Sequence, residues 1–82
     1  MLKVRVLFFA SYREQAGTGV EMIQLPQESD LGNLIRVVCE RHTNIKCPPE
    51  NIVVAVNEEF RDHSTIITEG DTVALIPPVS GG

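Results

Sequence analysis

The residues with the clearest potential for chemistry are two consecutive glycines, Gly81 and Gly82, which precede the terminal α-carboxylate. That carboxyl group has a reference pKa of about 3.3–3.7, so it is an anion at neutral pH. A carboxylate is a poor acyl donor, but attack on the α-phosphate of ATP converts it to an acyl-adenylate, from which a sulfur or nitrogen nucleophile can displace AMP. Because glycine has no Cβ, both residues fit a channel too narrow for any other residue. The ending therefore predicts a reaction performed on Gly82 by another protein.

The residues before the two glycines have the properties of a spacer. Pro77 and Pro78 lack backbone donors and restrict φ, so they end strand pairing and keep the chain extended. Val79 and Ser80 follow, and the whole ending from Pro77 onward can span at most ~20 Å. A frayed terminus is the alternative interpretation. We expect two parts in the chain: a domain at residues 1–76 and an extended tail at residues 77–82.

Other polar groups lack the spacing that catalysis or metal binding requires. Asp62, His63 and Ser64 have the residue types of a hydrolase triad, but sequence neighbours do not converge on one reacting atom, so a loop is expected. His42 falls at the end of a helical pattern, where a partly positive imidazole suits the helix dipole. Two histidines and two scattered cysteines offer no zinc or iron–sulfur site, and no glycine-rich phosphate loop is present. We expect no metal, no bound cofactor and no catalytic side chain.

The two cysteines, Cys39 and Cys47, do not form a CxxC pair. One lies in a helical pattern and the other in a loop flanked by proline. The favoured interpretation is two reduced thiols without a chemical role, and a disulfide or redox role is the alternative.

The size and charge of the chain restrict its partners. Its 82 residues suffice for one domain with a single modest core. A formal net charge of −4 repels phosphate backbones, so we expect no nucleic acid as a partner, and a protein with a basic face is more plausible. The longest apolar stretches fall far short of the ~20 residues that span a bilayer, and the N-terminal residues do not resemble a signal peptide. A cytoplasmic location without membrane contact is expected.

Apolar alternation predicts two strands in the first third of the chain. Residues 2–9 place every second residue on one apolar face, whereas the other face changes from Lys3 and Arg5 to Leu7 and Phe9. That second face is therefore expected to be partly covered or to form an exposed apolar edge. Residues 20–25 predict the second strand, which Pro26 ends. Residues 11–17 predict at best a short helical turn between a capping serine and a glycine.

The remaining pattern predicts one helix followed by strands. Residues 30–42 repeat apolar residues at helical spacing, with Ser29 or Asp30 as N-cap, and residues 43–51 form a loop. The apolar run 52–56 suits a strand covered on both faces or flanked closely by neighbours. A turn at residues 57–59, a returning strand from Phe60–Arg61 and a last strand at 72–76 follow. We predict an α+β fold: a mixed sheet of about five strands, its first and late strands in the middle, with one main helix across one face.

Several segments together resemble a known family. They are Val6–Ala10 with Arg13, Glu14 and Gly17, then Ala55–Asn57, then Glu69–Asp71, and finally Val73–Ile76 leading into Pro-Pro-Val-Ser-Gly-Gly. On these residues the chain resembles the small subunits of molybdopterin synthase, which are sulfur carriers with the ubiquitin-like β-grasp fold. The resemblance covers the whole chain except residues 28–51, where only the helix pattern agrees. Relatives that serve thiazole synthesis lack the double proline. In ubiquitin, basic residues precede the two glycines, whereas this chain has no lysine or arginine after Arg61.

The resemblance implies a sulfur-carrier cycle. An E1-like adenylyltransferase would use ATP to activate Gly82, and a sulfur-relay protein would convert the C-terminus to a thiocarboxylate. The tail, with Gly81 permitting entry, would then reach a pocket of the large subunit and donate sulfur to cyclic pyranopterin monophosphate. The implied assembly is a heterotetramer of two large and two small subunits. Partner-binding residues implied for the tail and docking face are Phe9, Phe60, Ile76, Pro77, Pro78, Val79 and Ser80.

The residue patterns themselves leave alternatives open. Phe9 and Phe60 are oddly placed for core residues, so an apolar interface is expected, with partial core burial as the rival. Tyr12 and the glycine-free turn at residues 57–59 depart from the family pattern. A carrier for thiamine-type or tRNA thiolation pathways, a ubiquitin-like modifier joined to target lysines through Gly82, and a passive interaction domain are the other functions considered.

Overall fold

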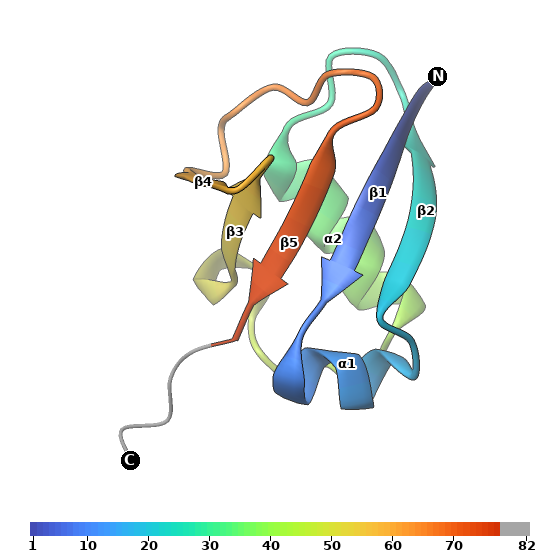
Figure 1. Ribbon diagram of the computed structural model, residues 1–82, viewed down its shortest axis with the longest axis vertical. Helices are drawn as coiled ribbons and strands as arrows, with labels where there is room; N and C mark the ends of the chain where they lie inside the picture. Colours follow the sequence, from blue (N-terminus) through green and yellow to red (C-terminus); the bar gives the residue numbers. More distant parts are fainter. Residues whose placement is uncertain (78–82) are drawn as a thin grey trace.

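The computed structural model describes residues 1–77, which form a five-stranded mixed sheet with two α-helices and a short 3₁₀-helix (Figure 1). Pro78–Gly82, and with them most of the predicted tail, lie outside the described residues. The elements in chain order are β1 (Leu2–Phe8), α1 (Ala10–Ala16), β2 (Val20–Leu25), α2 (Leu31–Arg41), η1 (Pro49–Asn51), β3 (Val53–Val56), β4 (Glu59–Arg61) and β5 (Thr72–Ile76).

The sheet places the first and last strands side by side at its centre. The strand order is β2-β1-β5-β3-β4, and β1 and β5 are parallel whereas the other pairs are antiparallel. This order confirms the predicted α+β architecture with the first and late strands in the middle. Because β5 pairs on both sides, the strand that leads into the tail is anchored in the middle of the sheet.

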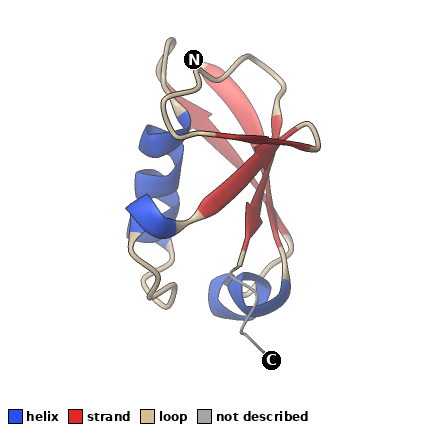
Figure 2. Ribbon diagram, turned by 90° about the vertical axis from the view of Figure 1, so that its left-hand side faces the viewer, coloured by secondary structure: helices blue, strands red, loops and turns tan. Residues whose placement is uncertain are grey.

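Helix α2 covers one face of the sheet, and no helix of residues 1–77 covers the opposite face (Figure 2). Its apolar stripe is fully buried and consists of Leu31, Leu34, Ile35 and Val38. Asp30 is the N-cap, since its carboxylate accepts a hydrogen bond from the Asn33 amide at 2.9 Å. The helix thus begins and ends within one residue of the predicted bounds and supplies the core for β1 and β5.

Helix α1 corrects two expectations. It extends over seven residues rather than one turn, and Ser11 does not cap it. The cap position is Phe9, whose carbonyl accepts hydrogen bonds from the Tyr12 and Arg13 amides. A helix this short is marginal alone, so the packing of Tyr12, which is 2% exposed, into the core stabilises it. Gly17 ends the helix as predicted, in the left-handed conformation that favours glycine.

The segment before β3 also differs from the expectation. Residues 49–51, predicted as loop, form the 3₁₀-helix η1. Strand β3 is not covered on both faces, because Val53 is half exposed. The alternative interpretation is correct: β3 lies between β5 and β4, and its apolar run is flanked by neighbouring strands.

Candidate functional site

The sheet face opposite α2, here called the open face, carries a continuous row of apolar residues. Strand pairing aligns Leu7 of β1 with Ala74 of β5, Ala74 with Ala55 of β3, and Ala55 with Phe60 of β4. The row continues to Val20 of β2, which pairs with Leu7. Further apolar residues beside the row are Met22, Val53, Ile76 and Phe9. Side chains alternate between the faces of a strand, so these residues share the face that α2 leaves uncovered.

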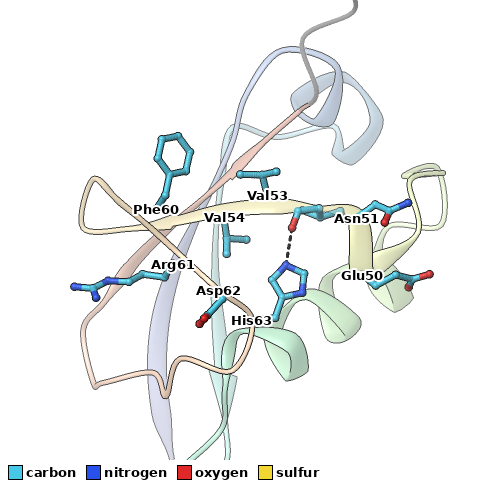
Figure 3. A pocket seen from close by; sticks show the side chains of 9 residues that line it. Glu50, Asn51, Val53, Val54, Phe60, Arg61, Asp62 and His63 are labelled. Atoms are coloured by element: carbon cyan, nitrogen blue, oxygen red, sulfur yellow. Dashed lines mark hydrogen bonds between the residues drawn. The ribbon is translucent and has the colours of Figure 1, made fainter.

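The large side chains of the open face are accessible to solvent. Phe60 is 72% exposed, and Phe9, Val20, Met22 and Val53 are each about half exposed. Figure 3 shows Phe60 and Val53 pointing to one side of the sheet and Val54 pointing to the other. Scattered exposed hydrophobes are ordinary, but a contiguous group on one face is typical of an interaction surface. The exposure of Phe60 also excludes its burial in the core, which was the rival interpretation.

A hollow of about 330 Å³ lies on the open face. Its floor consists of Leu7, Ala55 and Ala74, its near end is Phe9, and its far end is formed by Asn57, Glu58 and Thr72. The two alanines face each other across β3 and β5, and their short side chains leave the space that larger residues would fill. The face is therefore concave in its middle, with an aromatic side chain at one end of the hollow and polar side chains at the other.

The base of the predicted tail adjoins this face. Ile76 pairs with Val53 at the end of β5 and is followed by the partly exposed Pro77. The remaining tail residues predicted to bind a partner, Pro78, Val79 and Ser80, and the reactive Gly81 and Gly82 lie outside the described residues. The structure thus brings Phe9, Phe60 and Ile76 to one side of the molecule, and Pro77 follows directly after Ile76.

Comparison with known proteins places this arrangement in a family. The model of the ThiS family matches residues 6–82, which include the apolar face and the tail. The chain belongs to the ThiS family. Its similarity covers 97–100% of the two curated relatives named next.

The relatives of this ThiS-family chain include molybdopterin synthase sulfur carrier subunits. The subunit of Mycobacterium tuberculosis is 34% identical, with 100% of both chains covered. The human subunit is 34% identical, with 100% of this chain and 97% of the human chain covered.

Solved structures confirm the β-grasp fold. A putative molybdopterin converting factor subunit 1 from Pyrococcus furiosus has a TM-score of 0.85 at 30% identity, with 96% of this chain and 100% of that chain covered. A Helicobacter pylori complex of subunits 1 and 2 of molybdopterin-converting factor contains a chain with a TM-score of 0.69 at 27% identity, covering 99% and 100%. SAMP1 from Haloferax volcanii has a TM-score of 0.85 at 24% identity, covering 98% and 99%, and shows the fold alone.

Asp62, His63 and Ser64 form a loop in this ThiS-family chain, as predicted. Ser64 donates a hydrogen bond to Asp62, whereas the His63 ring donates from Nε2 to the Ile52 carbonyl at 2.6 Å (Figure 3). His63 thereby fastens this loop to the start of β3, beside a groove of about 540 Å³. The three side chains do not form a hydrogen-bonded relay.

The two thiols lie on the side of the sheet that α2 covers, apart from the open face. Cys39 and Cys47 pack against the core near the buried Tyr12, and both are free. Burial raises the pKa of the Cys39 thiol, and the neighbouring Cys47 adds to the rise. Burial likewise raises the pKa of Tyr12, with smaller contributions from the two thiols. Because the thiolate is the reactive form, the raised pKa of Cys39 favours the interpretation without a chemical role.

Two findings complete the description of residues 1–77. No three His, Cys, Asp or Glu side chains in this range gather closely enough to hold a metal ion. Neither α-helix in the range has the length and apolar character needed to cross a bilayer.

Sequence reasoning missed several apolar residues of the open face: the small Ala55 and Ala74, and the larger Val20, Met22 and Val53. For Val20 and Met22 a signal existed, because alternation along β2 places them opposite the buried Ile23 and Leu25. For Val53 no signal existed, because every residue of the run 52–56 is apolar and the pattern does not indicate which side chains face the core.

Proposed function

We propose that this chain is the sulfur carrier of molybdopterin synthase and delivers sulfur from its C-terminal Gly82. The observation that carries the proposal is that the family match continues through to Gly82. The relatives matched over the full length are sulfur carrier subunits by name. The tail is attached to the central strand β5, at the edge of an exposed apolar face suited to a protein partner.

The proposed cycle begins with activation of the terminal carboxylate. A Gly82 oxygen attacks the α-phosphate of ATP on an E1-like adenylyltransferase, pyrophosphate leaves, and an acyl-adenylate forms. A persulfide or other sulfur donor of a relay protein then displaces AMP, and reduction of the resulting acyl disulfide by a thiol leaves a thiocarboxylate. The thiocarboxylate finally transfers its sulfur to cyclic pyranopterin monophosphate in the large subunit. In this cycle the chain contributes an extended tail and the Gly82 carboxylate, and its partners contribute the catalytic groups.

The proposed partner for the open face is the large subunit, in a heterotetramer of two large and two small subunits. The Helicobacter pylori structure, a complex of subunits 1 and 2, supports a two-subunit assembly. Phe9, Phe60 and Ile76 would form the apolar centre of the contact, and the tail would continue from Pro77 into the large subunit. A cytoplasmic location belongs to the same proposal.

The first test follows the mass of the intact chain. Incubation with the E1-like enzyme, ATP and a sulfide source should give the mass gain of one oxygen-to-sulfur exchange, and addition of the large subunit with pyranopterin substrate should reverse it. A chain lacking Gly82 should show neither change. Synthesis of molybdopterin by this shortened chain would contradict the proposal.

The same experiment separates the carrier from a ubiquitin-like modifier. SAMP1, named a small archaeal modifier protein in a second structure, has the same fold, so the fold alone does not separate the two functions. A modifier would yield isopeptide adducts on target lysines, detectable as branched peptides in chain isolated from cells. A carrier for thiamine-type or tRNA thiolation pathways would form the thiocarboxylate but would not be consumed by the large subunit with its pyranopterin.

The second test concerns the open face. Phe60→Ala should weaken binding to the large subunit about 10- to 30-fold, because a central aromatic residue carries a large share of an interface's binding energy. Its thermal unfolding should be unchanged, since Phe60 is 72% exposed. Ile66→Ala is the matched control: Ile66 is also exposed but lies in the segment between β4 and β5, beside Asp30. Equal effects of the two variants would contradict the assignment of the open face.

A further inference from the structure

The hollow of the open face combines an apolar floor with a single acidic side chain. Leu7, Ala55 and Ala74 form the floor, and Glu58 stands at the far end next to Asn57. A volume of about 330 Å³ is at the lower end of the roughly 300–1,000 Å³ found for small-molecule sites. The hollow is large enough to receive one long side chain of a partner protein.

The turn that carries Glu58 is held in place by β5. The Asn57 amide donates to the Thr72 carbonyl at 2.8 Å, and the Thr72 amide donates to Asn57 Oδ1 at 3.1 Å. Asn57 Nδ2 also donates to Asp71 at 3.1 Å. These three bonds fasten the turn, so the backbone of Glu58 has a defined position at the end of the hollow.

Glu58 differs from the acidic residues around it because they already have partners. Glu59 forms an ion pair with Arg61 at 2.7 Å, and Asp71 accepts hydrogen bonds from Asn57 and Thr68. Within residues 1–77, Glu58 has no ion pair and no side-chain hydrogen bond. The cations on the same face are Lys3 and Arg5. Arg5 pairs with Thr72 and so lies beside the far end of the hollow, but neither cation lines the hollow or forms an ion pair with Glu58.

We propose that the hollow receives a lysine or arginine side chain of the large subunit, with its aliphatic stem on the apolar floor and its cationic head at Glu58. This inference rests on the proposed function. An apolar partner side chain would cover Glu58 without pairing it, which costs free energy, and an anionic one would be repelled. Long cationic side chains bury their stems along apolar surface while keeping the charge at a polar edge. The net charge of −4 further favours a partner with a basic face.

The test is a comparison of two adjacent carboxylates. Glu58→Gln removes the charge but keeps the length of the side chain. It also leaves the backbone freedom of the turn unchanged, because no glycine is introduced. It should weaken binding of the full chain to the large subunit about three- to tenfold at low salt, with a smaller difference at high salt. Glu59→Gln, which removes a neighbouring charge outside the hollow, should change the affinity less than about twofold.

A double-mutant cycle identifies the occupant. Each lysine or arginine of the large subunit is replaced in turn, and the variant that faces Glu58 should show no additional loss when combined with Glu58→Gln. The reversal Glu58→Lys should weaken binding more than Glu59→Lys does. Equal affinities of Glu58→Gln and the unchanged chain, or the absence of coupling with every basic residue, would overturn the inference.

The two proposals fail in different ways. If Glu58→Gln binds normally while Phe60→Ala binds weakly and the thiocarboxylate still forms, only the role of Glu58 is wrong. If the unchanged chain does not bind the large subunit, the proposed function and this inference are both wrong.

Discussion

At the scale of single residues, the turn between β3 and β4 is the least expected feature. Asn57 and Glu58 have φ angles of 50° and 74°, a conformation that two-residue hairpin turns require and that favours Asn followed by Gly. The missing glycine was noticeable in the sequence as a departure from the family pattern. The position of this turn at the end of a hollow was not visible in the sequence, because it depends on the pairing of Ala55 with Ala74.

Replacing Glu58 by glycine should stabilise the domain by about 0.5–1 kcal/mol. A residue with a Cβ in the left-handed conformation costs roughly 1–2 kcal/mol, and glycine removes this cost. The greater freedom of glycine in the unfolded chain offsets about 0.4–1 kcal/mol of the stabilisation. Urea unfolding of both chains measures the difference.

Gly70→Ala is the matched control, and it should lower the free energy of unfolding where Glu58→Gly raises it. Gly70 has a φ of 85° and open space where a Cβ would stand, so its substitution tests conformation alone and should destabilise. If Glu58→Gly is more stable but binds the large subunit more weakly, the strain in this turn is retained for binding. A less stable Glu58→Gly variant would show that the turn is not strained.

At the scale of elements, one polar cluster joins the edge strand β2 to the end of α2. Glu21 of β2 accepts from Arg41 at 3.2 Å and contacts His42 Nε2 at 2.7 Å. Burial raises the pKa of the Glu21 carboxyl, but the hydrogen bonds and charges of His42 and Arg41 outweigh it, so the net pKa is lowered. The cluster therefore stabilises the ionised form of Glu21 in the folded state.

We predict that Glu21→Gln destabilises the domain by about 0.5–1 kcal/mol at pH 7. Because the folded pKa is lowered, this difference is complete above the unfolded pKa near 4.5 and disappears as the pH falls through the folded pKa. Denaturant unfolding of both chains between pH 7 and pH 3 checks it, with the exposed Glu40→Gln as control. A difference that stays constant down to pH 3 would refute the electrostatic origin.

The elements themselves were predictable where their pattern was local. The bounds of β2 and β5 agree with the prediction, and those of α2 agree within one residue, because alternation, helical spacing and caps are visible within a few residues. The length of α1 was not predictable, since it depends on the burial of Tyr12 by distant segments. The 3₁₀-helix at 49–51 was missed because its Pro-Pro start is equally typical of a loop.

At the scale of the whole molecule, the site depends on strand order more than on any local pattern. The sequence indicated that Phe9 and Phe60 were unusual, but not that β1, β5, β3 and β4 lie next to one another in that order. The parallel pairing of β1 with β5 joins residues more than sixty positions apart, and no local signal specifies it. The open face and its hollow could therefore be recognised only in the folded chain.

This strand order also predicts where the molecule is rigid. Strand β5 is paired on both sides, and its Val73 and Leu75 are fully buried, whereas β4 has three exposed residues at the edge of the sheet. We expect amides of β5 to exchange with solvent only through global unfolding and those of β4 through local opening, with a lower opening free energy. Native-state hydrogen exchange followed by NMR measures both in one sample.

A rigid β5 has a consequence for sulfur delivery. A tail of six residues reaches at most ~20 Å, so its attachment point must hold its place relative to the docked face if Gly82 is to arrive at a partner's reaction centre. Leu75→Ala leaves a cavity and should cost about 2–5 kcal/mol, lowering the protection of β5 and β1 together, whereas Phe60→Ala should leave both unchanged. Exchange of β5 as fast as that of β4 in the unchanged chain would show that the anchor is mobile and that the large subunit itself must position the tail.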